Sequence, residues 1–352
     1  MGRIISVPEK DNNKTGLNVY RNKESVRAME QIPLFLEDHV LANTADADLA
    51  DLRLSEAIDG YRTYTEFYGA DADIARKRIL AEFLRDGLCR ISFADRNCPD
   101  DLCELWDAFE RNAHEQGLRK DGLLPDIRKS FFQHAADVLT RYHADNLPGA
   151  GNHYPAGYVF MKAGAWKQAI HTLRARIASD PDNARLYGYL GDAFYLGGNL
   201  DAASQCYFEA CLIDPAALDW RNMQNHELLL LLQELMEDRD DHDTNGEAWI
   251  AVQAYLHGMI FPRPVDQKLK LAELVERYLE KERAYIENRQ VETAAQIFLI
   301  GIVLCAHEPL LRQIKGADFA AIRARMKDIN PTLFEQYLKS IGKQQKRQCG
   351  NQ

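Results

Sequence analysis

Apolar residues recur at helical spacing along most of the chain. Between residues 40 and 58 they return every three or four positions, which predicts one amphipathic helix with a single buried face. The run 88–93 alternates as a strand does, but one isolated strand has nothing to pair with. The pattern therefore predicts an all-α fold, with further helices at about 72–87, 100–115, 127–146, 218–236, 246–260, 266–288, 291–306, 317–328 and 331–341.

Helix breakers and polar stretches divide this chain into predicted regions. The N-terminal segment 1–23 is polar and lacks periodicity, as is typical of a flexible arm. Proline and glycine in the stretch 146–152 resist helix continuation, and we place a domain boundary there. The predicted regions are an arm at 1–23, a helical domain at 24–146, repeats with a capping helix at 150–236, a helical region at 246–341 and a disordered basic tail at 342–352.

The strongest signal is a repeat, because similar side chains precede Pro181 and Pro215 at matching distances. The first unit contains His153, Ala156, Gly157, Phe160, Ala169 and Leu173, and the second contains Tyr187, Leu190, Gly191, Phe194, Ala203, Tyr207 and Ala210. Glycine on the first helix of each unit and alanine on the second allow two backbones to approach closely. Glycine-containing turns at 163–165 and 197–199 supply left-handed backbone between the helices. The sequence thus predicts two tandem helical hairpins.

This pattern resembles the tetratricopeptide repeat (TPR) superfamily over the segment 150–215. The offset between the two prolines equals the repeat length of that family. The resemblance implies stacked helix pairs with a concave face that binds a partner protein. Two units are fewer than such stacks normally need, so we expect flanking helices to cap them, with 218–236 at the C-terminal side.

The resemblance places nine residues on the concave face: Tyr154, Tyr158, Met161, Lys162, Arg185, Gly188, Asp192, Tyr195 and Leu196. All of them except Gly188 and Leu196 make up the candidate partner-binding site. Tyr154 and Tyr158 occupy two positions of the clamp with which some family members hold a C-terminal carboxylate, so a chaperone-tail receptor is not expected. Aromatic and arginine side chains are instead common in protein recognition hot spots. The alternative is that flanking helices fill the groove and that these aromatic residues belong to the core.

Composition narrows the function further. A formal net charge of −10 argues against nucleic-acid binding, which needs a basic face. Seven cysteines without a Cys-x-x-Cys pair favour a reducing compartment, and we expect a cytoplasmic protein without a secretory signal. The longest apolar stretch, 294–306, falls short of the roughly 20 residues that span a membrane.

No group of residues forms a signature of catalysis, of a cofactor or of a metal. His242 stands in the acidic run 237–243 but lacks the spacing of an EF-hand. His134 and His143 each have one aspartate nearby and no second pair of ligands. A glycine-rich phosphate loop and a Gly-x-Ser-x-Gly turn are also missing. We therefore expect no enzyme activity, no cofactor and no metal.

The favoured function is that of a cytoplasmic adaptor or scaffold, which binds a peptide or a helix of another protein through the repeat groove. A dedicated assembly or secretion chaperone is a second interpretation. From a different class, residues 24–146 would be an all-helical enzyme domain that the repeats regulate, and a convergent polar pocket would distinguish it. The oligomeric state does not follow from the sequence.

Overall fold

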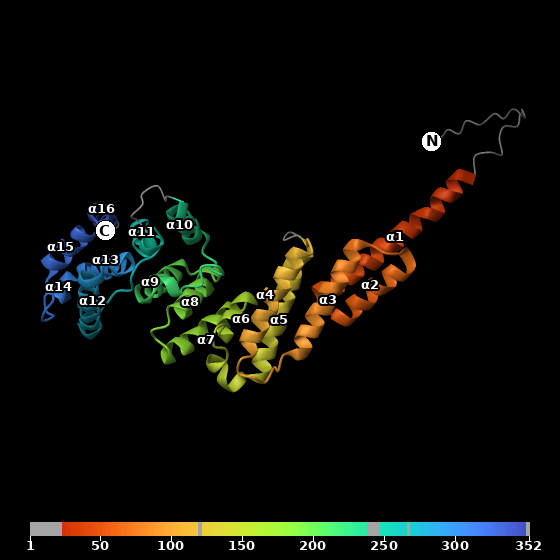
Figure 1. Ribbon diagram of the computed structural model, residues 1–352, viewed down its shortest axis with the longest axis horizontal. Helices are drawn as coiled ribbons and strands as arrows, with labels where there is room; N and C mark the ends of the chain where they lie inside the picture. The colour runs from red at the N-terminus through yellow and green to blue at the C-terminus, as the bar shows by residue number, and fades with distance from the viewer. Residues whose placement is uncertain (1–22, 119–121, 238–245, 266–267, 350–352) are drawn as a thin grey trace, which may run out of the picture. The chain divides into compact units, whose positions relative to one another are not determined.

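The computed structural model describes residues 23–118, 122–237, 246–265 and 268–349, and none of them forms a β-strand (Figure 1). This confirms the predicted all-α class. The flexible arm predicted at 1–23 lies almost wholly outside the described residues. None of the described helices is long and apolar enough to cross a bilayer.

The chain divides into two compact units, Met1–Cys89 with Ala108–Ile127 and Arg90–Asp107 with Arg128–Gln352. The boundary predicted at 146–152 lies inside the second unit. Two contacts to the segment just before helix α4 (Cys98–Glu115) explain why this proline- and glycine-rich stretch is not a linker. Arg96 donates from Nε to the Gly149 carbonyl at 2.7 Å, and the Gly151 N–H donates to the Arg96 carbonyl at 2.8 Å.

The first unit begins with two helices where the apolar spacing predicted one. Helix α1 (Lys23–Ala50) ends before a turn at Leu52, and α2 (Leu54–Tyr68) follows. Leu52 adopts the left-handed backbone region, with φ of 58°. The two helices pack so closely that a Cβ added at Gly60 would lie 2.9 Å from the Cβ of Ala45. The apolar stripe between 40 and 58 is therefore two helical faces that bury each other, and the single predicted helix is wrong.

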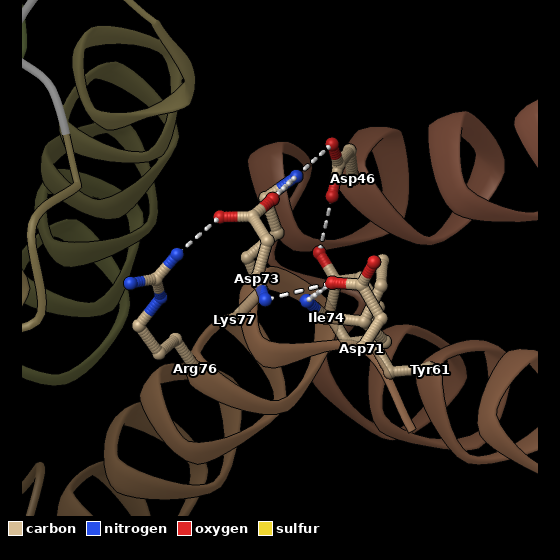
Figure 2. Close-up of polar contacts among 7 residues, drawn as sticks. All are labelled: Asp46, Tyr61, Asp71, Asp73, Ile74, Arg76 and Lys77. Atoms are coloured by element: carbon tan, nitrogen blue, oxygen red, sulfur yellow. Dashed lines mark hydrogen bonds and ion pairs between the residues drawn. The ribbon is translucent and has the colours of Figure 1, made fainter. Parts of the chain in front are cut away.

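A polar cluster joins these two helices to α3 (Ala72–Arg90), as Figure 2 shows. Asp46 accepts a hydrogen bond from the Tyr61 hydroxyl at 2.7 Å and forms an ion pair with Lys77, also at 2.7 Å. Lys77 makes a second ion pair with Asp73 at 3.0 Å. Burial acts to lower the pKa of Lys77, but its hydrogen bonds to the two carboxylates raise it. The ammonium is therefore held in its charged form between three helices.

The second unit contains the repeated segment, in which four helices follow one another and each packs against the next (Figure 1). They are α6 (Ala156–Lys162), α7 (Trp166–Ser179), α8 (Ala184–Leu196) and α9 (Leu200–Ile213). Gly164 and Gly198 have φ of 78° and 79°, so both turns use the predicted left-handed glycines.

The two helix pairs make the same close contact at equivalent positions of the two units. A Cβ added at Gly157 would lie 2.5 Å from Cγ of Leu173, and one added at Gly191 would lie 2.6 Å from Cε1 of Tyr207. The Ala169 carbonyl lies beside the first of these contacts, 3.3 Å from the position of a Cβ at Gly157. Large buried residues of the second helix thus occupy the space that each glycine leaves.

Replacing Gly191 by alanine is expected to lower the free energy of unfolding by about 1–3 kcal/mol. Tyr207 is fully buried and its hydroxyl donates to Asp192 at 2.7 Å, so the ring has little freedom to move away. Gly188 lies on the same helix and is a matched control, because an added Cβ meets only Leu218 at 3.7 Å. Gly188→Ala should be neutral, or more stable by up to about 1 kcal/mol. Urea unfolding measures both changes, and equal midpoints for the two variants would contradict the close packing at Gly191.

Other helices lie on both sides of the repeats. On the N-terminal side α5 (Leu123–Tyr142) is followed by the 3₁₀ helix η1 (Ala144–Gly149). On the C-terminal side are η2 (Pro215–Ala217), α10 (His226–Glu237), η3 (Gly246–Trp249), α11 (Ile250–Leu256), α12 (Lys268–Asn288), α13 (Val291–Ala306), α14 (Glu308–Leu311), α15 (Phe319–Ile329) and α16 (Pro331–Cys349).

Two of these helices differ from the prediction. Residues 218–225 are not helical, so the capping helix predicted at 218–236 begins only at His226. Helix α16 continues to Cys349 and therefore enters the tail that was predicted to be disordered. Helix α13 has the predicted bounds, and its apolar side chains are buried where it packs against α12 and α15.

Candidate functional site

The predicted concave face is largely closed to solvent. Tyr154, Tyr158, Met161 and Asp192 are buried, and Tyr154, the most exposed of the four, shows only 7% of its surface. Lys162, Arg185 and Tyr195 are half-buried. The four buried side chains have little surface to offer to a partner.

The first segment that covers this face is the start of α4. The Asp100 carboxylate accepts backbone N–H groups of Asn152, His153 and Tyr154 at 2.7, 2.9 and 2.6 Å. Further along α4, Asp107 accepts a hydrogen bond from the Tyr154 hydroxyl at 3.1 Å. These contacts fix the entry to α6 and hold Tyr154 against the chain's own helix.

The second covering segment is the non-helical stretch 218–225. Asp219 accepts a hydrogen bond from the Tyr189 hydroxyl at 2.8 Å, and the backbone N–H of Gln224 donates to Asp192 at 3.0 Å. Met223 is buried in the same stretch. Other segments of the same chain therefore cover the concave face. This agrees with the alternative interpretation, in which flanking segments fill the groove.

The covered face holds a row of aromatic rings. Ring centroids of Tyr154 and Tyr158 are 5.0 Å apart, and those of Tyr158 and Tyr189 are 4.7 Å apart. Lys162 places its ammonium 5.2 Å from the centroid of Tyr158, and burial lowers the pKa of this lysine. At the exposed end of the row, Arg185 contacts Nδ1 of His153 through Nη1 at 2.7 Å. The row packs as core and links the two helix pairs.

Asp192 is the buried carboxyl group of this face. Burial raises the pKa of its carboxyl to about 7, while hydrogen bonds from the Gln224 N–H and the Tyr207 hydroxyl and the charge of Lys162 act in the opposite direction. Near neutral pH the group therefore exists in both protonation states, at a point where the second helix pair contacts the covering stretch.

Tyr195 differs from the other predicted residues because it lines an open pocket. This pocket has a volume of about 620 Å³ and lies where the α8–α9 turn, the start of α10 and residues 258–261 meet. Its lining consists of Tyr195, Leu196, Leu200, Asp201, Ala203, Ser204, Asn225, Glu227, Gly258, Met259 and Phe261. We call it the α9–α10 pocket.

Two leucines of the α9–α10 pocket are unusually exposed. Leu200 shows 61% of its surface and Leu196 shows 37%. They lie on either side of the Gly197–Gly198 turn. Asparagines order the pocket edges: Asn199 accepts the Ala202 N–H at 3.1 Å at the start of α9, and Asn225 accepts the Leu228 N–H at 3.2 Å at the start of α10.

The candidate metal ligands in the sequence have other contacts or lie apart. No group of three or more metal-ligating side chains occurs among the described residues. His143 contacts the Phe93 carbonyl through Nε2 at 2.9 Å, and burial lowers the pKa of His134. His242 lies outside the described residues.

Sequence reasoning placed Tyr195 and Leu196 on the concave face but missed the other residues of the pocket. Leu196 and Leu200 on either side of a glycine turn were an available signal, because a tight turn leaves large apolar residues beside it exposed. Met259 and Phe261 carried no such signal, since only the return of the chain after α11 brings them to α9. Comparisons with protein-family models, with curated proteins and with solved structures find no match for this chain.

Proposed function

We propose that this chain is an interaction scaffold of the tetratricopeptide type, which binds a peptide or a helix of a partner protein. The contact of Gly157 with Leu173, repeated by Gly191 with Tyr207 at the equivalent position of the second unit, supports the kinship with such repeats. The partner-binding surface in this proposal is the α9–α10 pocket, because the concave face is occupied by the chain's own segments. Tyr195 is the predicted site residue that belongs to it.

The observation that carries the proposal is the exposure of Leu196 and Leu200 beside a pocket of about 620 Å³. Removing apolar surface from water is favourable by roughly 25 cal/mol for each Å², so these leucines favour a partner that covers them. The volume falls within the range of sites that enclose a ligand or a few side chains. Exposed apolar side chains around such a hollow are typical of protein-binding sites.

We place the protein in the cytoplasm. All six cysteines whose surroundings are described are free thiols, and Cys98, Cys103, Cys206 and Cys211 among them are buried. Burial raises the pKa of the Cys98 and Cys211 thiols to about 12, which keeps them protonated and unreactive. Unpaired, protonated thiols fit a reducing compartment.

The proposal predicts that a double change, Leu196→Ser with Leu200→Ser, abolishes recovery of the partner in affinity purification from the native cell. Truncating such anchors costs about 2 kcal/mol or more of binding free energy, or roughly thirtyfold in affinity. The thermal melt should stay near that of the wild type, since Leu200 contributes little buried surface. Leu230→Ser is the matched control, because this leucine is 60% exposed on α10 and does not line the pocket.

Recovery of the same protein, in the same amount, by the wild type and by the double variant would contradict this site. Equal loss with Leu230→Ser would show that general surface hydrophobicity holds the partner, and the pocket proposal would then fail as well. A fall in the melting temperature of the double variant alone would assign the two leucines to the core.

A further inference from the structure

We infer that residues 218–225 form a pH-sensitive strap, which ionisation of Asp192 releases from α8 together with the adjoining wall of the α9–α10 pocket. The inference rests on the proposed function for its biological role, because this wall belongs to the proposed binding site. Three observations carry it: the way the strap is tied to α8, its continuity with the pocket, and the burial of the carboxyl group that ties it.

The strap crosses the covered face without a helix of its own and is tied to α8 at two points. Near its start, Asp219 accepts a hydrogen bond from the Tyr189 hydroxyl at 2.8 Å. Near its end, the Gln224 N–H donates to Asp192 at 3.0 Å. A segment without a helical hydrogen-bond ladder opens at a lower free energy than the helices around it. The strap therefore depends on these anchors more than a helix would.

The side chains of the strap are partly covered. Leu218 and Met223 are buried, and Leu218 lies against α8. Trp220 and Asn222 are half-buried, and Arg221 is exposed. The apolar pair keeps the strap near α8, and the two polar anchors fix its position there. Loss of a polar anchor should therefore loosen the strap without unfolding the helices beneath it.

The end of the strap continues directly into the pocket. Gln224 is followed by Asn225, which is buried. The Asn225 side chain accepts the N–H groups of Glu227 and Leu228 at 3.1 and 3.2 Å and so caps α10. Asn225 and Glu227 both line the α9–α10 pocket. Neighbouring Cα atoms are about 3.8 Å apart, so Gln224 cannot leave Asp192 without displacing Asn225.

Asp192 is enclosed where the strap is docked. It is 2% exposed, and its Oδ1 accepts both the Gln224 N–H and the hydroxyl of Tyr207 on α9, at 3.0 and 2.7 Å. Burial is the main influence on this carboxyl and raises its pKa to about 7. The two hydrogen bonds and the charge of Lys162 on α6 act in the opposite direction, while Asp219 of the strap repels the ionised form.

The direction of the switch follows from hydration. Release of the strap lets water reach Asp192 and takes Asp219 away, and both changes favour the ionised form in the released state. The docked state therefore binds the proton more tightly, so a fall in pH keeps the strap docked and a rise releases it. With a pKa of about 7 when docked and the ordinary 3.8 when released, the released fraction should rise about tenfold between pH 6 and 8.

Hydrogen exchange of the purified full-length chain, followed by mass spectrometry at pH 6 and 8, tests the strap without a partner. Asp192→Asn is the reference, because asparagine cannot ionise and leaves the intrinsic exchange of the strap amides unchanged. The ratio of wild-type to Asp192→Asn exchange at the Gln224, Glu227 and Leu228 amides should rise about tenfold from pH 6 to 8. These amides should also exchange faster than those of α13, which are expected to open only with the whole fold.

Asp219→Ala removes the other anchor, so that the test does not depend on Asp192 alone. At pH 6 it should speed the exchange of the same three amides about fivefold, the equivalent of one hydrogen bond, and leave α13 unchanged. Asp182→Ala is the matched control, since this aspartate is exposed before α8 and lines a separate surface cavity, and it should change none of these rates. Faster exchange at Gln224 without any at Glu227 and Leu228 would overturn the link between strap and pocket.

The strap and the proposed function fail in different ways. A constant ratio between pH 6 and 8, or equal exchange of the strap and α13, would overturn the strap and leave the pocket as the proposed binding site. A tenfold rise, combined with normal partner recovery by the Leu196→Ser, Leu200→Ser double variant, would support the strap and overturn the pocket as the binding site. If both proposals hold, partner recovery by the wild type should be lower at pH 8 than at pH 6, and recovery by Asp192→Asn should not change.

Discussion

Replacing Asp100 by alanine should lower the free energy of unfolding by about 3–5 kcal/mol, because three backbone N–H groups lose a charged acceptor. These groups belong to Asn152, His153 and Tyr154, and Asp100 itself is 8% exposed. Water therefore cannot easily replace the carboxylate. The loss should appear in urea unfolding as a lower midpoint with an unchanged slope.

The neighbouring Asp101→Ala is the matched control for this prediction. Burial and the charges of Asp95 and Asp100 raise the pKa of the Asp101 carboxyl, so its charge is not favoured where it lies. Its removal should change the stability by less than about 1 kcal/mol. Similar losses in the two variants would mean that Asp100 acts as an ordinary acid of the first helical turn and does not clamp the residues before α6.

Asp192→Asn should raise the stability by less than about 2 kcal/mol at pH 5 and by up to about 4 kcal/mol at pH 8. The folded carboxyl has a pKa of about 7, above the ordinary value of 3.8. Its contribution to stability is therefore fully present below the ordinary pKa and is lost as the pH rises through the folded one. Asparagine stays neutral and keeps an oxygen for Tyr207 and Gln224, so the benefit grows as the pH rises from the ordinary pKa to the folded one.

Asp192→Ala separates this charge effect from the hydrogen bonds. Alanine offers no acceptor to Tyr207 or Gln224, so this variant should be destabilised relative to Asp192→Asn at every pH. Chemical unfolding of the three proteins from pH 5 to 8 gives the comparison. A constant difference between wild type and Asp192→Asn over that range would refute the raised pKa as a determinant of stability.

The helices followed from the sequence wherever a local signal was sufficient. Helix α13 is an uninterrupted apolar run apart from its first turns, and the turns at Gly164 and Gly198 use a residue that adopts positive φ without strain. No glycine or proline marks the turn at Leu52, so the apolar periodicity predicts a single helix that runs through it. The stretch 218–225 contains no glycine or proline either, so nothing in it marks a later start of the helix predicted at 218–236. Leu218 and Met223 are buried, but as part of a cover over the repeats.

Whether the concave face is open or covered depends on contacts that the repeat pattern does not reveal. Tyr154 is held by Asp107, 47 residues earlier in the chain, and Asp192 is held by Gln224, 32 residues later. The sequence of one hairpin alone predicts that these residues lie on a surface, because it contains no sign of the distant segments that pack on them. The α9–α10 pocket depends in the same way on residues 258–261, whose place beside α9 the sequence does not predict.

Site-specific photo-crosslinking in the native cell tests the central claim most directly. A photoreactive phenylalanine placed at position 200 should form a covalent adduct with a partner protein, because Leu200 lines the open pocket. The same probe at position 185, beside the covered face, and at position 269, a 71% exposed leucine on α12, should not. An adduct at position 185 with none at position 200 would contradict the account and return the binding site to the concave face.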